Sequence, residues 1–141
     1  MKPLAYILPI AIFPLMLFLI GCKKKDSQGV NASQYYVKYI VSSSPNITQG
    51  WANKINVSIV NEKNDTVKFV IDVDTQSESI IGPVTKNFAA MIRAEMPSTN
   101  QKIYLNAQIA VSKDNEPFVV KEIDNSINLR NSVELNYIVD Y

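Results

Sequence analysis

From Tyr35 onward, apolar and polar residues alternate along the chain in short runs. In the first run Tyr35, Val37, Tyr39 and Val41 share one face. The same period of two recurs in four later runs, which cover residues 55–59, 67–73, 103–111 and 133–139. Their apolar positions are mostly β-branched or aromatic, as half-buried strands require. Each run is therefore predicted to be a β-strand.

Turn-forming residues separate these runs at short intervals. Residues 61–65 and 97–100 have the composition of hairpin loops. Residues 86–96 are ambiguous because their apolar positions would also suit a helix. We interpret them as a strand, since a Gly-Pro pair precedes the segment and Pro97 follows it. About seven strands with short connections predict an all-β, antiparallel β-sandwich domain over residues 35–141.

The N-terminus follows a different pattern. Residues 4–20 are almost entirely apolar behind a positively charged start, which is the layout of a secretory signal. Residues 19–22 resemble a bacterial lipobox and end at Cys22, the one cysteine of the chain. We expect a lipoprotein signal peptide over residues 1–21 and lipidation of Cys22. An uncleaved membrane anchor is the alternative, although three prolines interrupt the apolar run.

Lipidation of Cys22 would fix where the domain resides. A diacylglycerol thioether leaves no free thiol, and its two acyl chains suffice for stable attachment to membrane lipid. Residues 22–34 lack periodicity and predict a flexible tether. Lys23 stands where lipoproteins retained in the inner membrane carry aspartate. We therefore expect a cell-envelope lipoprotein, held at the outer membrane and facing the periplasm.

Composition narrows the possible chemistry. The chain has 14 basic and 13 acidic residues and no basic stripe, so it gives no support to nucleic-acid binding. It contains no histidine, which removes the commonest general base and the commonest transition-metal ligand. With the cysteine lipidated, neither a Ser-His nor a Cys-His pair is available, nor an ordinary zinc site. We predict a protein that is not an enzyme and needs no cofactor or metal.

Few side chains are candidates for a site. Asp72 and Asp74 fall on one face of a predicted strand, with Glu78 just beyond, and carboxylates in such a group can hold calcium. No calcium-loop motif accompanies them, so we expect solvated side chains. Tyr36 and Trp51 are the aromatic residues best placed for exposure, where they would bind a ligand by stacking.

Thr66 is a candidate for covalent modification. Residues 65–67 match a short bacterial O-glycosylation pattern of aspartate, threonine and an aliphatic residue. The pattern falls at the edge of a predicted loop, where an enzyme could reach it. We therefore expect Thr66 to be a possible glycosylation site.

Three short patches resemble a known family. Residues 36–42, 82–90 and 111–118 resemble small Bacteroidetes lipoproteins related to MmpS-type transport accessory proteins. The resemblance implies an immunoglobulin-like β-sandwich and, for the mycobacterial branch, partnership with a large proton-driven exporter. Asn87 stands where relatives carry glycine, a departure that is tolerable if this residue has a positive φ, where Asn is the best substitute. The family has no catalytic residues to transfer.

These observations predict a non-enzymatic envelope lipoprotein whose sandwich domain binds or supports another envelope protein, such as a transporter. The alternative is a lipoprotein that binds a glycan or small molecule through Tyr36 and Trp51. A flat apolar patch or an open edge strand would favour the first hypothesis. Exposed aromatic residues above a groove would favour the second.

Overall fold

Nine β-strands make up the part of the chain that the structure, a computed structural model, describes: residues 32–45 and 54–140. Cys22, Trp51 and the predicted signal peptide lie outside these ranges. Within them, no helix has the length and hydrophobicity needed to cross a membrane. The strands are β1 (Tyr35–Ser44), β2 (Lys54–Val60), β3 (Thr66–Asp72), β4 (Gln76–Val84), β5 (Ala89–Glu95), β6 (Ile103–Lys113), β7 (Val119–Asp124), β8 (Leu129–Arg130) and β9 (Ser132–Ile138).

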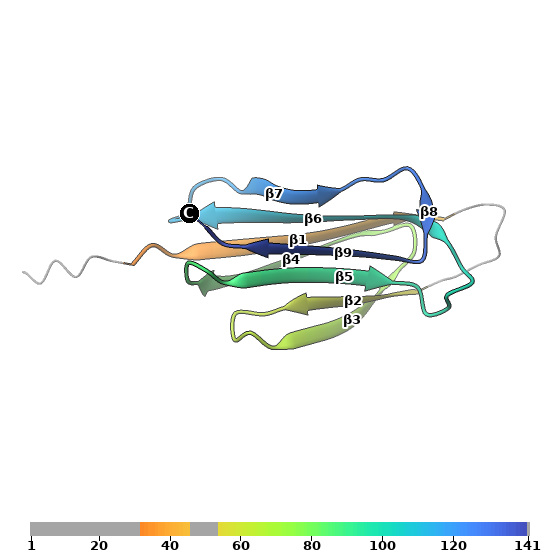
Figure 1. The fold of residues 1–141 in the computed structure, drawn as a ribbon, viewed down its shortest axis with the longest axis horizontal. Coiled ribbons are helices and arrows are strands. Elements are labelled where there is room, and N and C mark those ends of the chain that lie inside the picture. Colours follow the sequence, from red (N-terminus) through yellow and green to blue (C-terminus); the bar gives the residue numbers. More distant parts are fainter. Residues whose placement is uncertain (1–31, 46–53, 141) are drawn as a thin grey trace, which may run out of the picture. The chain divides into compact units, whose positions relative to one another are not determined.

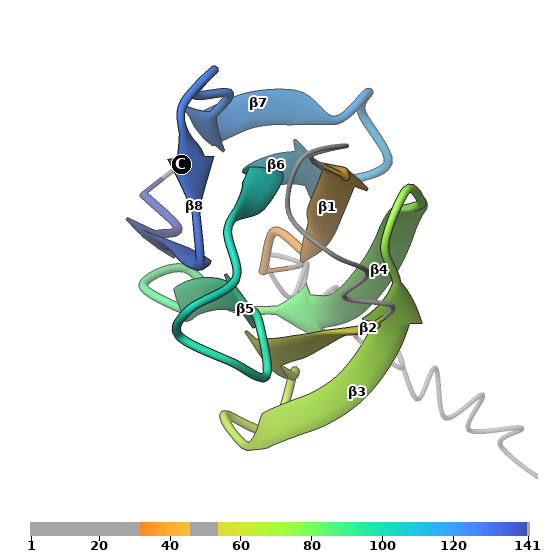
Figure 2. The ribbon, with the colours of Figure 1, turned by 90° about the vertical axis from the view of Figure 1, so that its right-hand side faces the viewer.

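The strands form two antiparallel sheets (Figure 1). Sheet A has the order β4-β1-β6-β7, with the short β8 beside β6, and sheet B has the order β3-β2-β5-β9. Viewed along the strands, β7, β6 and β1 form one layer, and β5, β2 and β3 lie opposite (Figure 2). These findings confirm the prediction of an all-β chain with antiparallel strands.

The core lies between the sheets and follows the alternation in the sequence. Every second residue of β2 and β6 is buried, and so are Val37, Tyr39 and Val41 of β1. β6 of sheet A lies against β5 and β9 of sheet B. The hydroxyl of Tyr39 donates a hydrogen bond to the carbonyl oxygen of Val60 at 2.9 Å, which joins β1 to β2 across the core.

Several predictions along the chain are confirmed. Residues 61–65 form the hairpin turn between β2 and β3, closed by a hydrogen bond from the Asn61 amide to the Asp65 carbonyl. The ambiguous segment 86–96 contains the strand β5. Asn87, just before it, has a φ of 70°, which meets the condition under which asparagine can stand in place of glycine.

Other predictions are wrong. The described residues hold nine strands rather than about seven, because β4, β7 and β8 do not show a clean alternation. Residues 97–100 do not form a hairpin, since they connect β5 of sheet B to β6 of sheet A. Asp72 and Asp74 do not share a strand face. The strand ends at Asp72, and Asp74 has a φ of 66° in the corner that leads to β4.

The two ends of the described domain differ in what they carry. β1 begins at the end where β9 finishes, and there the Asp114 amide donates to the Gln34 carbonyl at 2.9 Å (Figure 1). The opposite end holds the corner between β3 and β4, the loop from β5 to β6, and the loop from β7 to β8 (Figure 1). The chain from residue 32 thus enters the domain far from these loops.

Candidate functional site

The outer faces of the two sheets differ in chemical character. On sheet B, Lys54 of β2 pairs with Asp72 of β3 at 2.6 Å. Arg93 of β5 lies 2.6 Å from Glu95 on its own strand and 3.6 Å from Glu134 on β9. These charged groups are half-exposed and satisfy one another, so the outer face of sheet B is suited to contact with water.

The outer face of sheet A carries apolar side chains on all four of its main strands. Strand register aligns Glu78, Ile40, Gln108 and Ile123 in one row across β4, β1, β6 and β7. A neighbouring row consists of Ile80, Lys38, Ala110 and Val120. Ile80, Val120 and Ile123 are about half exposed or more. Three solvent-exposed aliphatic residues thus fall in two adjacent rows of this face.

Lys38 and Tyr36 border this apolar surface on β1. The Lys38 ammonium lies 4.8 Å from the centre of the Phe118 ring and 3.8 Å from a carboxylate oxygen of Glu78. Tyr36, half-buried, lies against Gly82. A Cβ at Gly82 would come within 2.9 Å of the Tyr35 carbonyl and 2.7 Å of Tyr36 Cδ1, at a φ of 137°. Glycine is therefore the residue that allows β4 to approach the start of β1.

A shallow hollow lies farther along the same face. Its volume is about 210 Å³, and Ile40 and Ile123 provide its apolar lining. The polar lining comes mainly from amide side chains: Gln76, Asn106, Gln108 and Asn125. A hollow that combines aliphatic side chains with several amides can hold either a polar ligand or the side chain of a protein partner.

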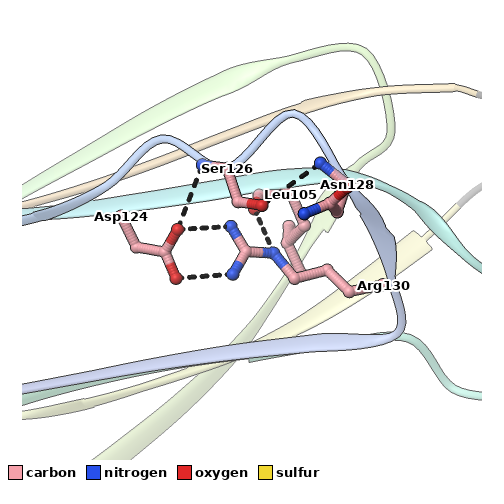
Figure 3. A network of polar contacts seen from close by, with 5 residues as sticks. All are labelled: Leu105, Asp124, Ser126, Asn128 and Arg130. Atoms are coloured by element: carbon pink, nitrogen blue, oxygen red, sulfur yellow. Dashed lines mark hydrogen bonds and ion pairs between the residues drawn. The ribbon is translucent and has the colours of Figure 1, made fainter.

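An ion pair between Asp124 and Arg130, called the buttress below, lies beside the hollow and holds the loop between β7 and β8 (Figure 3). The Arg130 guanidinium donates to both carboxylate oxygens of Asp124, at 2.5 and 2.7 Å. Its Nε donates to the Leu105 carbonyl on β6 at 2.7 Å. Asp124 also accepts from the Ser126 amide at 3.1 Å, and the Asn128 amide donates to Ser126 Oγ.

Electrostatics strengthens this buttress. The hydrogen bonds from Arg130 hold the pKa of the Asp124 carboxyl below its usual value, and partial burial opposes this shift. The carboxylate therefore stays ionised and paired over the physiological pH range. The loop that lines one side of the hollow is consequently held in a defined conformation.

The structure describes the positions of some, but not all, of the site residues predicted from the sequence. Tyr36 lies on the outer face of sheet A, whereas Cys22 and Trp51 fall outside the described residues, so no Tyr36–Trp51 pair is described. Thr66 is exposed at the first position of β3. Glu78 lies beside Lys38 on sheet A and Asp72 beside Lys54 on sheet B. In the described ranges, no group of three or more acidic side chains is placed to hold a metal ion.

The hollow and the Asp124–Arg130 buttress were not anticipated. Neither Asp124 nor Arg130 belongs to a recognisable sequence motif. Their side chains meet only after β7 and β8 pair with the two ends of β6. Ile80 and Ile123 were also missed. Ile123 is an isolated isoleucine, which does not reveal which face of a strand it occupies. The doublets Ile80-Ile81 and Val119-Val120 were the available signal, because consecutive apolar residues in a strand point to opposite faces.

Comparison with other proteins adds no identification. The chain matches no known protein-family model, and no curated protein is significantly similar to it. Functional inference therefore depends on the chain's own residues.

Proposed function

We propose that this chain is a non-enzymatic lipoprotein of the cell envelope whose domain docks onto another envelope protein through the outer face of sheet A. The observation that carries the proposal is the difference between the two outer faces. Ile80, Val120 and Ile123 are exposed on sheet A, whereas ion pairs occupy the centre of sheet B. Burial of about half of each of these aliphatic side chains would favour association.

The proposed attachment is a diacylglycerol on Cys22, which would hold the protein at the outer membrane facing the periplasm. The direction of β1 is consistent with a docking role for such a protein. The tether would join the domain at Tyr35, and Ser42 beside the hollow lies seven strand residues farther on, or about 23 Å. The hollow would thus lie on the part of the domain that is farther from the tether.

The fold that we propose for the domain is immunoglobulin-like. The pairing of β1 with β4, of β2 with β3 and β5, and of β5 with β9 follows the neighbour relations of immunoglobulin strands B, E, C, C′, F and G, in the same chain order. β6 takes the place of strand A beside β1, and β6 to β8 are inserted before the last strand. This arrangement is consistent with the fold that the resemblance in residues 36–42 and 82–90 implies. Because of that resemblance, a transporter is the partner class that we propose first.

A second candidate function is the binding of a glycan or another small polar ligand. The observation in its favour is the hollow, where four amide side chains surround Ile40 and Ile123. Tyr36 lies on the same face, although toward the other end of β1. Titration calorimetry with soluble envelope glycans, using the full chain and a Gln108→Ala variant, would test this alternative. Binding that the variant loses would support it.

The experiment for the docking proposal is crosslinking in the native envelope followed by purification of the full chain. Ile123→Lys changes the outer face of sheet A. Ile138→Lys is its matched control on sheet B, because the two isoleucines are 54% and 53% exposed. We expect one specific partner to be recovered with the wild type and the control, and to be lost with Ile123→Lys.

The same experiment can contradict the proposal. Equal recovery of the partner with both lysine variants would show that sheet A does not make the contact. A third variant, Cys22→Ala, tests the attachment. If this variant fractionates with the membranes and recovers the partner as the wild type does, lipidation of Cys22 is not what brings the two proteins together.

A further inference from the structure

β4 forms one border of sheet A. It pairs with β1 along one edge, and no strand in the described ranges pairs with its other edge. The opposite border of the sheet is different, because β7 lies close to β9 of sheet B and Lys121 Nζ is 6.0 Å from the centre of the Tyr137 ring. A free strand edge presents backbone N–H and C=O groups that can pair with another chain.

Side chains on β4 form two sets that a paired strand would meet. Gln76, Glu78 and Ile80 point to the outer face of sheet A, because their partners on β1 are the outward residues of that strand. Ser77 and Ser79 point to the inner side and are only partly buried. The outer set thus includes an acidic and an apolar side chain, and the inner set consists of two small side chains.

Glu78 retains capacity for a second cation. Its Oε1 accepts a hydrogen bond from Gln76 Nε2 at 3.2 Å, and its Oε2 lies 3.8 Å from Lys38 Nζ. Each carboxylate oxygen has two lone pairs and the side chain is 46% exposed, so a further donor can reach it. Ile80, one outward position farther along β4, is 58% exposed. Side chains directly opposite one another on paired strands interact, so these two residues select a basic and an apolar neighbour.

We propose that an extended segment of the partner protein pairs with residues 76–81 of β4 as an additional strand of sheet A. The segment carries a basic side chain beside Glu78, an apolar side chain beside Ile80, and small side chains beside Ser77 and Ser79. Pairing ends before Pro83, which has no N–H to donate. This inference rests on the proposed docking function and specifies the kind of segment that docks.

A second copy of this chain fits the edge less well. If two copies of β4 paired antiparallel about Glu78, the two carboxylates would lie opposite each other. If they paired about Ser79, Glu78 would lie opposite Ile80, so neither side chain would gain its preferred neighbour. The free edge of β3 is also less suitable, because its outward side chains belong to the ion-paired face of sheet B.

The test uses the full chain in detergent and a synthetic peptide of about seven residues, with lysine and valine on one face and serine on the other. Two further peptides are N-methylated at alternate residues. In one, the methylated amides point to one edge of the peptide strand, and in the other they point to the opposite edge. Only one set can face β4. We expect calorimetry to show about tenfold or greater weakening with one N-methylated peptide and unchanged affinity with the other.

Two protein variants locate the peptide. Ile80→Lys is expected to weaken binding about fivefold, since it removes the apolar contact with the peptide valine and places a cation diagonally across from the peptide lysine. Val70→Lys on β3 is the matched control, because Val70 is 57% exposed, and it is expected to leave affinity unchanged. In spectra of the labelled protein, the backbone amides of β4 are the ones expected to shift on binding.

Several results would overturn the inference. These are the absence of peptide binding, equal weakening by both N-methylated peptides, and equal effects of Ile80→Lys and Val70→Lys. Concentration-dependent dimerisation that Ile80→Lys abolishes would assign the edge to a second copy instead. If the native partner is lost with Ile123→Lys but retained with Ile80→Lys, the docking function stands and the added strand is wrong.

Discussion

The hydroxyl of Tyr39 makes a prediction that tests the packing of the two sheets directly. Tyr39 is 1% exposed, and its hydroxyl donates to the Val60 carbonyl at 2.9 Å. The substitution Tyr39→Phe removes this donor while it retains the aromatic ring. The Val60 carbonyl then loses that hydrogen bond at the sheet interface. A net cost of about 1–1.5 kcal/mol at neutral pH follows, and a melting temperature lower by roughly 5 °C.

The sign of this effect changes at high pH. Burial raises the pKa of Tyr39 well above its ordinary value of 10.0, although the backbone of Met91 opposes the shift. In the unfolded chain the phenol ionises near pH 10, and in the folded protein it stays neutral to higher pH. The stability that Tyr39 contributes is therefore complete below pH 10 and decreases above it, by about 1.4 kcal/mol per pH unit.

The phenylalanine side chain has no ionisable proton, so the stability of Tyr39→Phe does not show this decrease above pH 10. The wild type and the variant should consequently be equally stable near about pH 11, and the variant should be the more stable above it. Urea unfolding at several pH values between 7 and 11.5 measures the difference between the two proteins. Because other groups titrate equally in both, the difference isolates position 39.

A control for this comparison is Tyr104→Phe, since Tyr104 lies exposed on β6. This substitution makes the same chemical change at an exposed position. If the difference between the wild type and Tyr39→Phe stayed constant from pH 7 to 11.5, the burial of the Tyr39 phenol would be refuted. A negligible cost at pH 7 would refute the hydrogen bond to Val60 instead.

Two further substitutions test local structure. Arg130→Met removes three hydrogen bonds and should cost about 2 kcal/mol, with faster amide exchange in the loop from β7 to β8. Because the Asp124 pKa is lowered, this difference should be present at neutral pH and shrink as the pH falls through that pKa; exchange unchanged by the substitution would argue against the buttress. At Asn87, where φ is 70°, substitution by alanine should lower stability by about 1 kcal/mol and substitution by glycine should not; equal melting temperatures would contradict the backbone conformation.

The sequence predicted best the strands with one face in the core. β1, β2 and β6 alternate because every second residue lies between the sheets. β4 could not be recognised in this way. Its residues 76–79 are polar on both faces, and it forms a strand because it pairs with β1 at the border of the sheet. That pairing is a long-range contact, which local alternation does not contain.

The candidate site was predictable only in outline. The outer-face position of Tyr36 follows from its alternation with Tyr35 and Val37, whereas its partial burial against Gly82 could not be read from the sequence. The hollow depends on four strands, and its amide residues come from segments that are distant in the chain. The sequence does not specify which strands become neighbours, so it could not reveal that Ile40 and Ile123 would lie on one surface.

Exposed aliphatic residues alone do not distinguish the two sheets, because Val70 and Ile138 of sheet B are as exposed as Ile80 and Ile123. The two sheets differ in the residues that lie between these exposed aliphatic side chains. On sheet B the intervening positions include Arg93, Glu95 and Glu134, whose ion pairs would have to be desolvated by any covering molecule. On sheet A they include Ile40 and Ala110, which need no such compensation, and one longer ion pair, between Lys38 and Glu78 at 3.8 Å. A partner can therefore cover sheet A at a lower desolvation cost, and the free edge of β4 borders that face.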